Sequence, residues 1–282
     1  MFTKKLIEII ACPKCKNEIL TFQFYESKGE EILSGEILCA KCERKFTIKN
    51  GIPNFLFLEC EDRIRRKWSQ TLRREKNLFK KLAEQNIWSN KWHEKSLKLK
   101  AQFANFCDFK GSILDVGCGN GDFATVSTIK LTEYYGIDPI VLECQYHFPF
   151  LRATGEFLPF KRNSFDNIIC ISTLDHLISP TKFFEEARRV LKNNGQICIL
   201  NTIEIKNIIN KLYFYGKDAI IKIYQRDFRG IKRGIKLVLL GRQDPHHMHH
   251  FIVKQLEDYF KAYFPNFSYK LVDRIIFMKG MR

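Results

Sequence analysis

Long apolar runs are missing from this sequence. Segments such as "IICI" and "IIF" are far too short to cross a bilayer, which takes about 20 consecutive apolar residues. The N-terminal stretch MFTKKLIEIIACPKC lacks the small residues of a signal-peptide cleavage site and carries Glu8 inside its apolar run. Hydrophobic residues make up 45% and charged residues 28%, which is typical of a folded globular chain. We therefore expect no transmembrane segment, no disordered tail and a cytoplasmic location.

Acidic residues are scarce relative to basic ones, but the imbalance is local. The 282 residues include 47 Lys and Arg against 31 Asp and Glu, a net charge of +16. Residues 59–110 hold 14 basic against 7 acidic side chains and residues 204–243 hold 10 against 3, so these two segments carry +14 of the total. A contact with RNA, an anionic lipid surface or a phosphorylated glycan carrier would have to use them. Solvated or amphipathic helical faces are the alternative.

The pattern of the ten cysteines excludes an ordinary disulfide framework. Six are scattered, several of them inside apolar stretches, which suits buried thiols in a reducing compartment. The other four form two C-x2-C pairs separated by 23 residues, and two strand-like runs between the pairs predict a hairpin that brings them together. Four thiolates favour a tetrahedral structural zinc and leave no open position for water. We predict a zinc ribbon held by Cys12, Cys15, Cys39 and Cys42.

The N-terminal block also has a family resemblance. CPKCKNEIL and GEILCAKCERKFTIKNGIPNFL resemble the small zinc-ribbon (Trm112-like) family that activates tRNA and protein methyltransferases in trans. The match extends over residues 6 to 58. The resemblance implies a domain that packs against a methyltransferase, and it implies no particular substrate.

A glycine loop follows a short apolar run in the middle of the chain. Residues 113–124 read ILDVGCGNGDFA, which predicts a buried strand, a turn at the glycines of positions 117, 119 and 121, and a helix from Phe123. Gly-x-Gly after a strand lets the backbone approach a ligand closely, because no Cβ intervenes. A second strand, YYGID, ends at Asp138, where an acidic side chain would hold a ribose by its hydroxyls.

Two further carboxylates bear on the choice of cofactor. A dinucleotide fold would have its last glycine at position 122, so that a pyrophosphate could bind the helix N-terminus. Asp122 is instead an anion at that position, and Asp115 lies just before the turn. A cofactor with a positive centre and no phosphate fits these charges better. S-adenosylmethionine has both properties.

The segments after the loop predict a Rossmann-like fold. We expect a strand at 167–172, a helix from about Pro180 to Lys192, an NNG stop and a strand at 196–201. Alternating strands and helices favour a doubly wound, parallel α/β sheet with its ligand at the carboxyl ends of the strands. Together with the glycine loop, these segments closely resemble class I S-adenosylmethionine-dependent methyltransferases of the type 11 group, over about 106–203 and again from 244.

That resemblance implies the cofactor contacts. The glycine loop would pack on the methionine part, Asp138 would hold the ribose and residues 154–156 would border the adenine. The family usually has an acidic residue where Thr154 stands, so the contact with the adenine amino group would pass to the backbone or to Glu156. The implied cofactor-binding set is Asp115, Gly117, Cys118, Gly119, Gly121, Asp138, Pro139, Gly155, Glu156, Phe157 and Ile171.

These observations divide the chain into three parts. We predict a zinc ribbon at 1–58, a basic helical linker or cap at 59–105, and a methyltransferase domain at 106–282. In the cap, Trp68, Leu72, Leu78 and Leu82 recur near helical spacing, so it could cover the cofactor cleft. A basic insertion at about 204–243 interrupts the methyltransferase pattern near the sheet edge where substrates enter.

Four of the seven histidines lie within HHMHH, residues 246–250. A metal site, acid–base work beside an acceptor and a structural role are all open, although no nearby Cys or Glu completes a known metal-ligand spacing. The family's post-strand Glu/Asp–His pair corresponds to Asp175 and His176. Our candidate catalytic residues are His246, His250 and His176.

The chemistry itself requires few residues. Methyl transfer from a sulfonium depends mainly on holding the nucleophile in line with the methyl group. ISTLDHL replaces the Asp/Asn-Pro-Pro-aromatic signature of adenine amino methylation, and no Pro-Cys is present for covalent pyrimidine chemistry. We expect a methyltransferase that acts on O, N or an activated C of a small-molecule, glycan or lipid-linked acceptor. An RNA methyltransferase and a non-catalytic cofactor-binding or scaffold protein are the alternatives.

Overall fold

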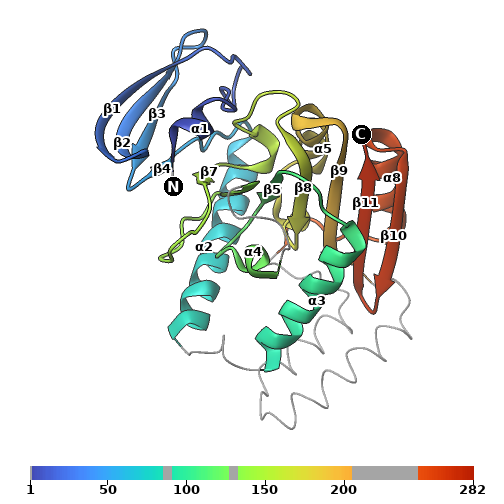
Figure 1. The fold of residues 1–282 in the computed structure, drawn as a ribbon. Coiled ribbons are helices and arrows are strands. Elements are labelled where there is room, and N and C mark those ends of the chain that lie inside the picture. The colour runs from blue at the N-terminus through green and yellow to red at the C-terminus, as the bar shows by residue number, and fades with distance from the viewer. Residues whose placement is uncertain (1, 85–90, 127–132, 205–246) are drawn as a thin grey trace.

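The computed structural model of the chain describes residues 2–84, 91–126, 133–204 and 247–282, and two β-sheets are present within them (Figure 1). One sheet is small and N-terminal, and the other is large, mixed and covered by helices. The predicted α/β class with an N-terminal β-rich ribbon is confirmed. His246 and residues 205–243 of the basic insertion lie outside the described residues.

The small sheet is an antiparallel meander that follows the short helix α1 (Lys4–Ile7). Strands β1 (Leu20–Lys28) and β2 (Glu31–Cys39) form the predicted hairpin, and β3 (Lys45–Lys49) and β4 (Ile52–Pro53) complete the order β1-β2-β3-β4. Each cysteine pair is followed by a residue with positive φ, Lys16 at 59° and Glu43 at 54°. The amide of each donates back to the first cysteine of its pair, which gives two equivalent knuckles.

The large sheet has the order β10-β11-β9-β8-β5-β6-β7. Its parallel strands are β5 (Ile113–Val116), β6 (Tyr134–Asp138), β7 (Phe150–Arg152), β8 (Phe165–Ile171) and β9 (Leu191–Thr202). The antiparallel strands β10 (Asn266–Val272) and β11 (Ile275–Met281) extend it beyond β9. The order reverses at β5, so a ligand site is expected beside the carboxyl end of that strand.

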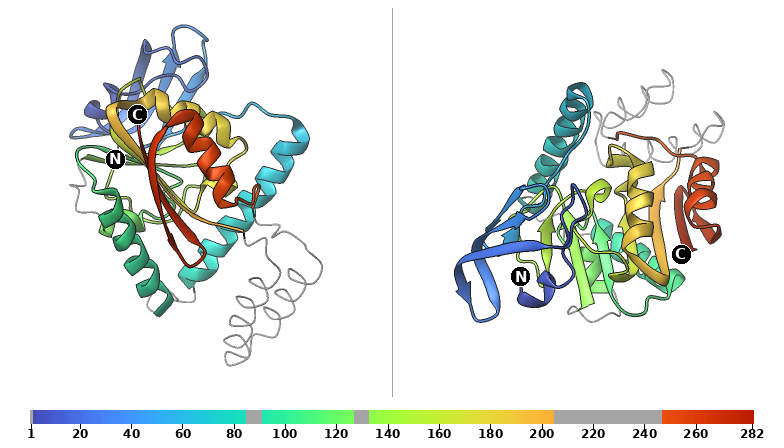
Figure 2. Two further views of the ribbon diagram at one scale, coloured as in Figure 1. Left: turned by 90° about the vertical axis from the view of Figure 1, so that its right-hand side faces the viewer. Right: turned by 90° about the horizontal axis from the view of Figure 1, so that it is seen from above.

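Helices cover both faces of this sheet (Figures 1 and 2). Helices α5 (Pro180–Val190) and α8 (Val253–Tyr263) pack on one face, and α3 (Lys91–Cys107) and α4 (Asp122–Val126) pack on the other. Alternate strand residues belong to the two cores: Ile168 and Cys170 face α5, whereas Ile169 faces α3. This alternation is the two-residue period of a strand that is buried on both faces.

Helix α5 begins as predicted and ends earlier. The Ser179 hydroxyl accepts a hydrogen bond from the amide of Lys182, and Pro180 occupies the first turn. The helix ends at Val190, and the chain enters β9 at Leu191 instead of stopping at NNG. The NNG residues lie inside β9, where the pairing with β8 shifts register between Phe165 and Asn167. A bulge absorbs the turn residues that were predicted to separate helix from strand.

Most of the predicted basic cap is helical in the structure. Helix α2 (Asp62–Glu84) runs from the ribbon along the large domain, and α3 follows it (Figure 1). Trp68 is buried, whereas Leu78 is 49% exposed. The side chain of Leu82 lies outside the described residues.

None of the described helices combines the length and apolar character that a bilayer span requires.

The ribbon and the large domain share one continuous core. Phe2, Leu6 and Phe55 of the ribbon belong to the same buried cluster as Leu151 and Phe160. Backbone hydrogen bonds join the two parts as well, from Ala11 to Pro159 (3.0 Å), from Lys161 to Ile9 (2.8 Å) and from Phe55 to Arg152 (2.8 Å). The ribbon is therefore an integral layer of the molecule.

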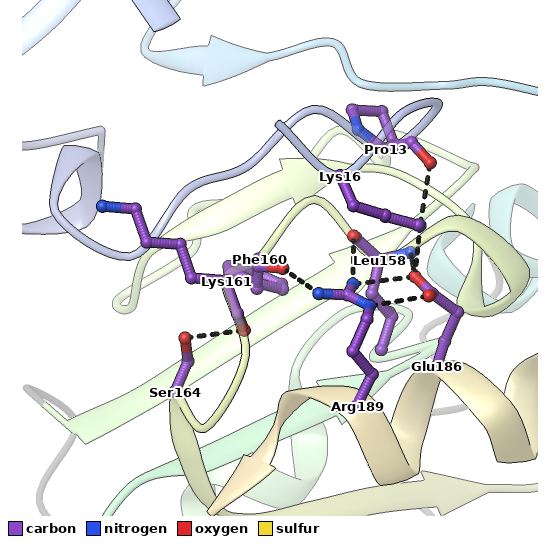
Figure 3. Close-up of polar contacts among 8 residues, drawn as sticks. All are labelled: Pro13, Lys16, Leu158, Phe160, Lys161, Ser164, Glu186 and Arg189. Carbon is purple, nitrogen blue, oxygen red and sulfur yellow. Dashed lines mark hydrogen bonds and ion pairs between the residues drawn. The ribbon is translucent and has the colours of Figure 1, made fainter. Parts of the chain in front are cut away.

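A partly buried ion cluster joins the ribbon to helix α5 at this interface (Figure 3). Lys16, the residue after the first knuckle, donates to the carboxylate of Glu186 on α5 at 2.5 Å and to the Pro13 carbonyl at 2.8 Å. Arg189 donates to both oxygens of that carboxylate at 2.8 and 2.9 Å. The Leu158 amide donates to it at 2.9 Å. Burial works to raise the pKa of Glu186, but Arg189 and Lys16 together lower it.

Candidate functional site

A cavity of about 700 Å³ opens at the carboxyl ends of the parallel strands. Residues at or just beyond the ends of β5, β6, β7, β8 and β9 all contribute to it. The predicted cofactor residues that line it are Asp115, Gly117, Cys118, Gly119, Asp138, Pro139, Gly155, Glu156 and Ile171. Residues as far apart in the sequence as Asp115 and Thr202 are thus brought to one place by the sheet topology.

The glycine loop forms the floor of the cavity. Gly117, Gly119 and Gly121 have φ of 77°, 55° and 82°, in the left-handed region that favours glycine. A Cβ on Gly117 would lie 2.2 Å from the Thr173 side chain, so this position has no room for another residue. A Cβ on Gly119 would meet nothing closer than Phe79 at 3.4 Å. The backbone at Gly119 is therefore open to a ligand.

Two buried carboxylates border this loop. Asp115 Oδ2 accepts a short hydrogen bond from the Tyr134 hydroxyl, while its buried Oδ1 has no hydrogen-bond partner in the described part of the chain. Asp138 accepts from the amides of Gly119 (3.0 Å) and Ile140 (2.7 Å). Burial raises the pKa of Asp115 to about 7 and that of Asp138 to about 6, although these hydrogen bonds oppose the shift. Such shifts mark groups that a bound cation or hydroxyl donor would stabilise.

In the segment after β7, residues 154–156 face the cavity and Phe157 does not. Thr154, Gly155 and Glu156 line it, but Glu156 Oε1 already accepts from the amides of Ile178 (2.6 Å) and Ser179 (3.3 Å). Phe157, a predicted cofactor contact, is absent from the lining.

The ring of Phe157 packs edge-on against Phe57 at 4.8 Å, with Lys182 at 5.1 Å from its centre. The 3-10 turn η3 (Gly155–Phe157) accounts for this, because it presents successive side chains in different directions. Gly121 is also outside the lining: a Cβ there would lie 2.7 Å from the Phe148 ring. Gly121 therefore serves the packing of the loop.

The cap supplies the remaining wall. Trp68, Leu72 and Phe79 of α2 and Lys100 of α3 line the cavity opposite the sheet. Lys100 also lies 3.6 Å from the carboxylate of Asp122. The sequence predicted that this apolar helix face could cover the cofactor cleft, and in the structure residues of α2 line the cavity.

Polar side chains gather where β8 and β9 end. Asp175 and His176 in the turn η4 (Leu174–His176) line the cavity together with His247. The nearest contact joins His247 Nδ1 and Asp175 Oδ2 at 2.8 Å, and His176 Nε2 lies 3.8 Å from Asp175 Oδ1. Burial works to raise the pKa of Asp175, yet the hydrogen bond from His247 and the two imidazoles hold it below its usual range.

The described histidines of HHMHH lie in two different places in the structure. His247 reaches the cavity, whereas His250 lines a separate, open hollow beside Tyr259 and Gln255. His246 lies outside the described residues. The sequence prediction named His246, His250 and His176 and missed His247. HHMHH has no regular period, so no sequence signal could have shown which of its members faces the cavity.

The four ribbon thiols form a second cluster. Sγ of Cys12 lies 3.6 Å from that of Cys42, and Sγ of Cys15 lies 3.5 Å from that of Cys39. All four sulfurs lie within 4.8 Å of one another, and none is in a disulfide. Zinc–sulfur bonds of about 2.3 Å in a tetrahedron place thiolates about 3.8 Å apart. The observed spacing fits a zinc ion.

Comparison with known families agrees with this architecture. Residues 114–199 match the family described as "Methyltransferase domain". This segment is similar to methyltransferase domains. Residues 3–51 match the family described as "Trm112p-like protein", so both resemblances drawn from the sequence are confirmed. The methyltransferase match begins in β5 and ends in β9, and thus spans the cavity floor.

The relatives of this methyltransferase domain are distant. The uncharacterized proteins MJ1123 and MJ0638 of Methanocaldococcus jannaschii are 31% and 32% identical over 49% and 48% of this chain. The matches span 66% and 61% of those two proteins. A ubiquinone biosynthesis O-methyltransferase of Pseudomonas putida is 25% identical over 58% of this chain and 71% of its own length.

Among solved structures, a "SAM-dependent methyltransferase, possible histamine N-methyltransferase" from Thermotoga maritima is similar at 18% identity and a TM-score of 0.49. That similarity covers 71% of this chain and 95% of the other.

Proposed function

We propose that this protein is an S-adenosylmethionine-dependent methyltransferase whose cofactor lies in the cavity at the strand ends. The observation that carries the proposal is the pair of buried carboxylates, Asp115 and Asp138, on either side of an open glycine loop within the matched domain. When bound, the cofactor supplies an electrophilic methyl group on a positively charged sulfur. Asp122 places a carboxylate at the start of α4, where a dinucleotide fold would bind the pyrophosphate.

Each cavity residue has a defined task in this proposal. Asp138 accepts hydrogen bonds from the ribose hydroxyls while the amides of Gly119 and Ile140 keep it in place. Asp115 offers its unpaired Oδ1 to the positive charge of the cofactor. Gly155 and the backbone beside it border the adenine, because the Glu156 carboxylate is already engaged. The apolar wall of α2 excludes water from the reacting sulfonium.

The acceptor is proposed to bind at the polar end, beside Asp175, His176 and His247. These side chains line the same cavity as the glycine loop, so an acceptor there can approach the methyl group in line. The structure favours His176 and His247 over His250 for this contact. An acceptor with an O–H, N–H or acidic C–H bond loses a proton in the transfer, and the O-methyltransferase named among the relatives supports an oxygen acceptor.

The same proposal extends to the ribbon. Cys12, Cys15, Cys39 and Cys42 would hold one structural zinc, with no position left for substrate. The zinc would act on the cofactor site through the interface of the ribbon with β7, α5 and residues 158–161.

Transfer of tritium from methyl-labelled cofactor to fractionated extract tests the activity and sorts the acceptor classes. We expect label in the small-molecule, glycan or lipid fraction, and heat-denatured protein is the control. Label in RNA that falls steeply with salt would point instead to contact through the exposed arginines of α2. Absence of both transfer and cofactor binding would leave a scaffold protein.

Cofactor affinity should depend on pH through Asp115. Its pKa of about 7 means that the carboxyl is largely protonated in the free protein below neutrality. A cationic cofactor favours the ionised form, so binding releases a proton and affinity rises with pH up to about 7, by at most tenfold per unit. Isothermal titration at pH 6, 7 and 8 measures this. Asp115→Asn should flatten the curve, and an equally steep curve in that variant would contradict the assignment.

A further inference from the structure

Besides acid–base chemistry, the cluster of Asp175, His176 and His247 has the side chains needed to bind a metal ion. Its ligand-capable atoms, one from each residue, lie within 4.8 Å of one another. Two imidazoles and one carboxylate are a donor set that divalent first-row metals take, and three protein ligands leave further positions open. The sequence showed no local residue to complete such a set near HHMHH. The fold supplies it from a turn some 70 residues earlier.

The two parts of this cluster are fixed to each other by the backbone. The amides of Met248 and His249 donate to the carbonyl of Asp175 at 2.8 and 3.0 Å. The loop that carries His247 is thereby tied to the turn that carries the other two residues. The Nδ1–Oδ2 distance of 2.8 Å between His247 and Asp175 is close to the separation of about 3 Å between neighbouring ligands around an ion with bonds of about 2.1 Å.

The position of the cluster is equally specific. All three side chains line the cavity that contains Gly117, Gly119 and Asp138, at its polar end. An ion held there would lie in the same cavity as the proposed methyl group. The second cluster of metal-ligand side chains among the described residues, the four ribbon thiols, belongs to the N-terminal domain.

We propose that Asp175, His176 and His247 bind a divalent first-row transition-metal ion, and that this ion binds a hydroxyl oxygen of the methyl acceptor. Metal coordination lowers the pKa of a bound hydroxyl, so the acceptor O–H bond breaks with its proton passing to water. The O–C bond then forms as the C–S bond breaks, and sulfur keeps the electron pair to leave as a neutral thioether. No oxidant or reductant takes part. The role in transfer rests on the proposed function, but binding of the ion does not.

Cobalt(II) binding to the zinc-loaded protein tests the site directly. Equilibrium dialysis followed by metal analysis should find one bound cobalt per chain in addition to one retained zinc. Its absorption should lack the intense bands of thiolate-bound cobalt. His176→Ala and His247→Ala should each weaken cobalt binding by at least about 10- to 100-fold, the range that loss of a ligand's supporting partner already costs. His147→Ala, which removes an exposed imidazole elsewhere, should bind cobalt like the wild type.

His247→Gln guards against a variant that merely fails to fold. Glutamine can donate a hydrogen bond to Asp175 but is a poor ligand for these ions, so a folded His247→Gln protein should still lose cobalt. A wild-type protein that binds no second metal, or a His247→Gln protein that binds it undiminished, overturns the proposal.

Calorimetry with S-adenosylmethionine in the absence of cobalt separates this outcome from failure of the proposed function. Cofactor binding without cobalt binding rejects the metal site alone, and the reverse rejects the methyltransferase alone.

Discussion

Replacing Asp138 with alanine should weaken binding of S-adenosylmethionine by at least about 100-fold. The carboxylate offers charge-assisted hydrogen bonds to two ribose hydroxyls, each worth about 1.5–3 kcal/mol, and 1.4 kcal/mol corresponds to a factor of ten. The change also frees the amides of Gly119 and Ile140, which hold the glycine loop against β6. Both effects act in the same direction. Isothermal titration calorimetry measures the loss.

A matched substitution separates the ribose contact from general loss of charge. Glu143 lies five residues further along the chain, is exposed and does not line the cavity. Glu143→Gln should therefore bind the cofactor with unchanged affinity. Far-ultraviolet circular dichroism of both variants checks that the sheet remains folded. Wild-type affinity in a folded Asp138→Ala protein would contradict the placement of the ribose.

Loss of zinc should unfold the ribbon and lower the stability of the whole chain. Structural zinc contributes an apparent folding free energy on the order of 10 kcal/mol, comparable to the total stability of a domain. Cys39 is fully buried, so Cys39→Ser places an unpaired polar group in the core as well as removing a ligand. We expect amide hydrogen exchange to become fast through residues 2–55. Leu151 and Phe160, which pack against the ribbon, should become exposed to solvent.

The comparison for this experiment is Cys60→Ser, because Cys60 is a half-buried thiol outside the cluster. That protein should keep one zinc and the exchange pattern of the wild type. A Cys39→Ser protein that retains slow exchange in β2 and β3 would show that the ribbon does not depend on a metal.

The sequence was most informative where chemistry constrains residue type and spacing together. Two C-x2-C pairs can form knuckles only when the turn after each second cysteine is tight, and Lys16 and Glu43 take the same turn. The strand before Gly117 could be predicted because the backbone at this position tolerates only glycine, which marks the turn after the strand. Asp138 could be predicted as a ligand contact because it is the last residue of β6. Ser179 and Pro180 likewise marked the start of α5.

The direction of individual side chains in short turns and loops could not be predicted from the sequence. Phe157 lies one residue beyond the cavity lining because η3 turns it toward the ribbon, and Glu156 is engaged by amides at the start of α5. His247 was missed because its orientation follows from the backbone bonds between residues 248–249 and Asp175, more than 70 positions away. Trp68 was expected on an apolar helix face that could cover the cofactor cleft, but only the tertiary structure shows which residues of α2 line the cavity.

The ion cluster of Lys16, Glu186 and Arg189 has a consequence for stoichiometry. A ribbon supplied as a separate chain would have to find its methyltransferase by diffusion, and the fraction paired would depend on concentration. Here the ribbon that carries Lys16 is covalently joined to the helix that carries Glu186, at an effective concentration on the order of millimolar or more. The pair is therefore insensitive to dilution and always present in equal amounts.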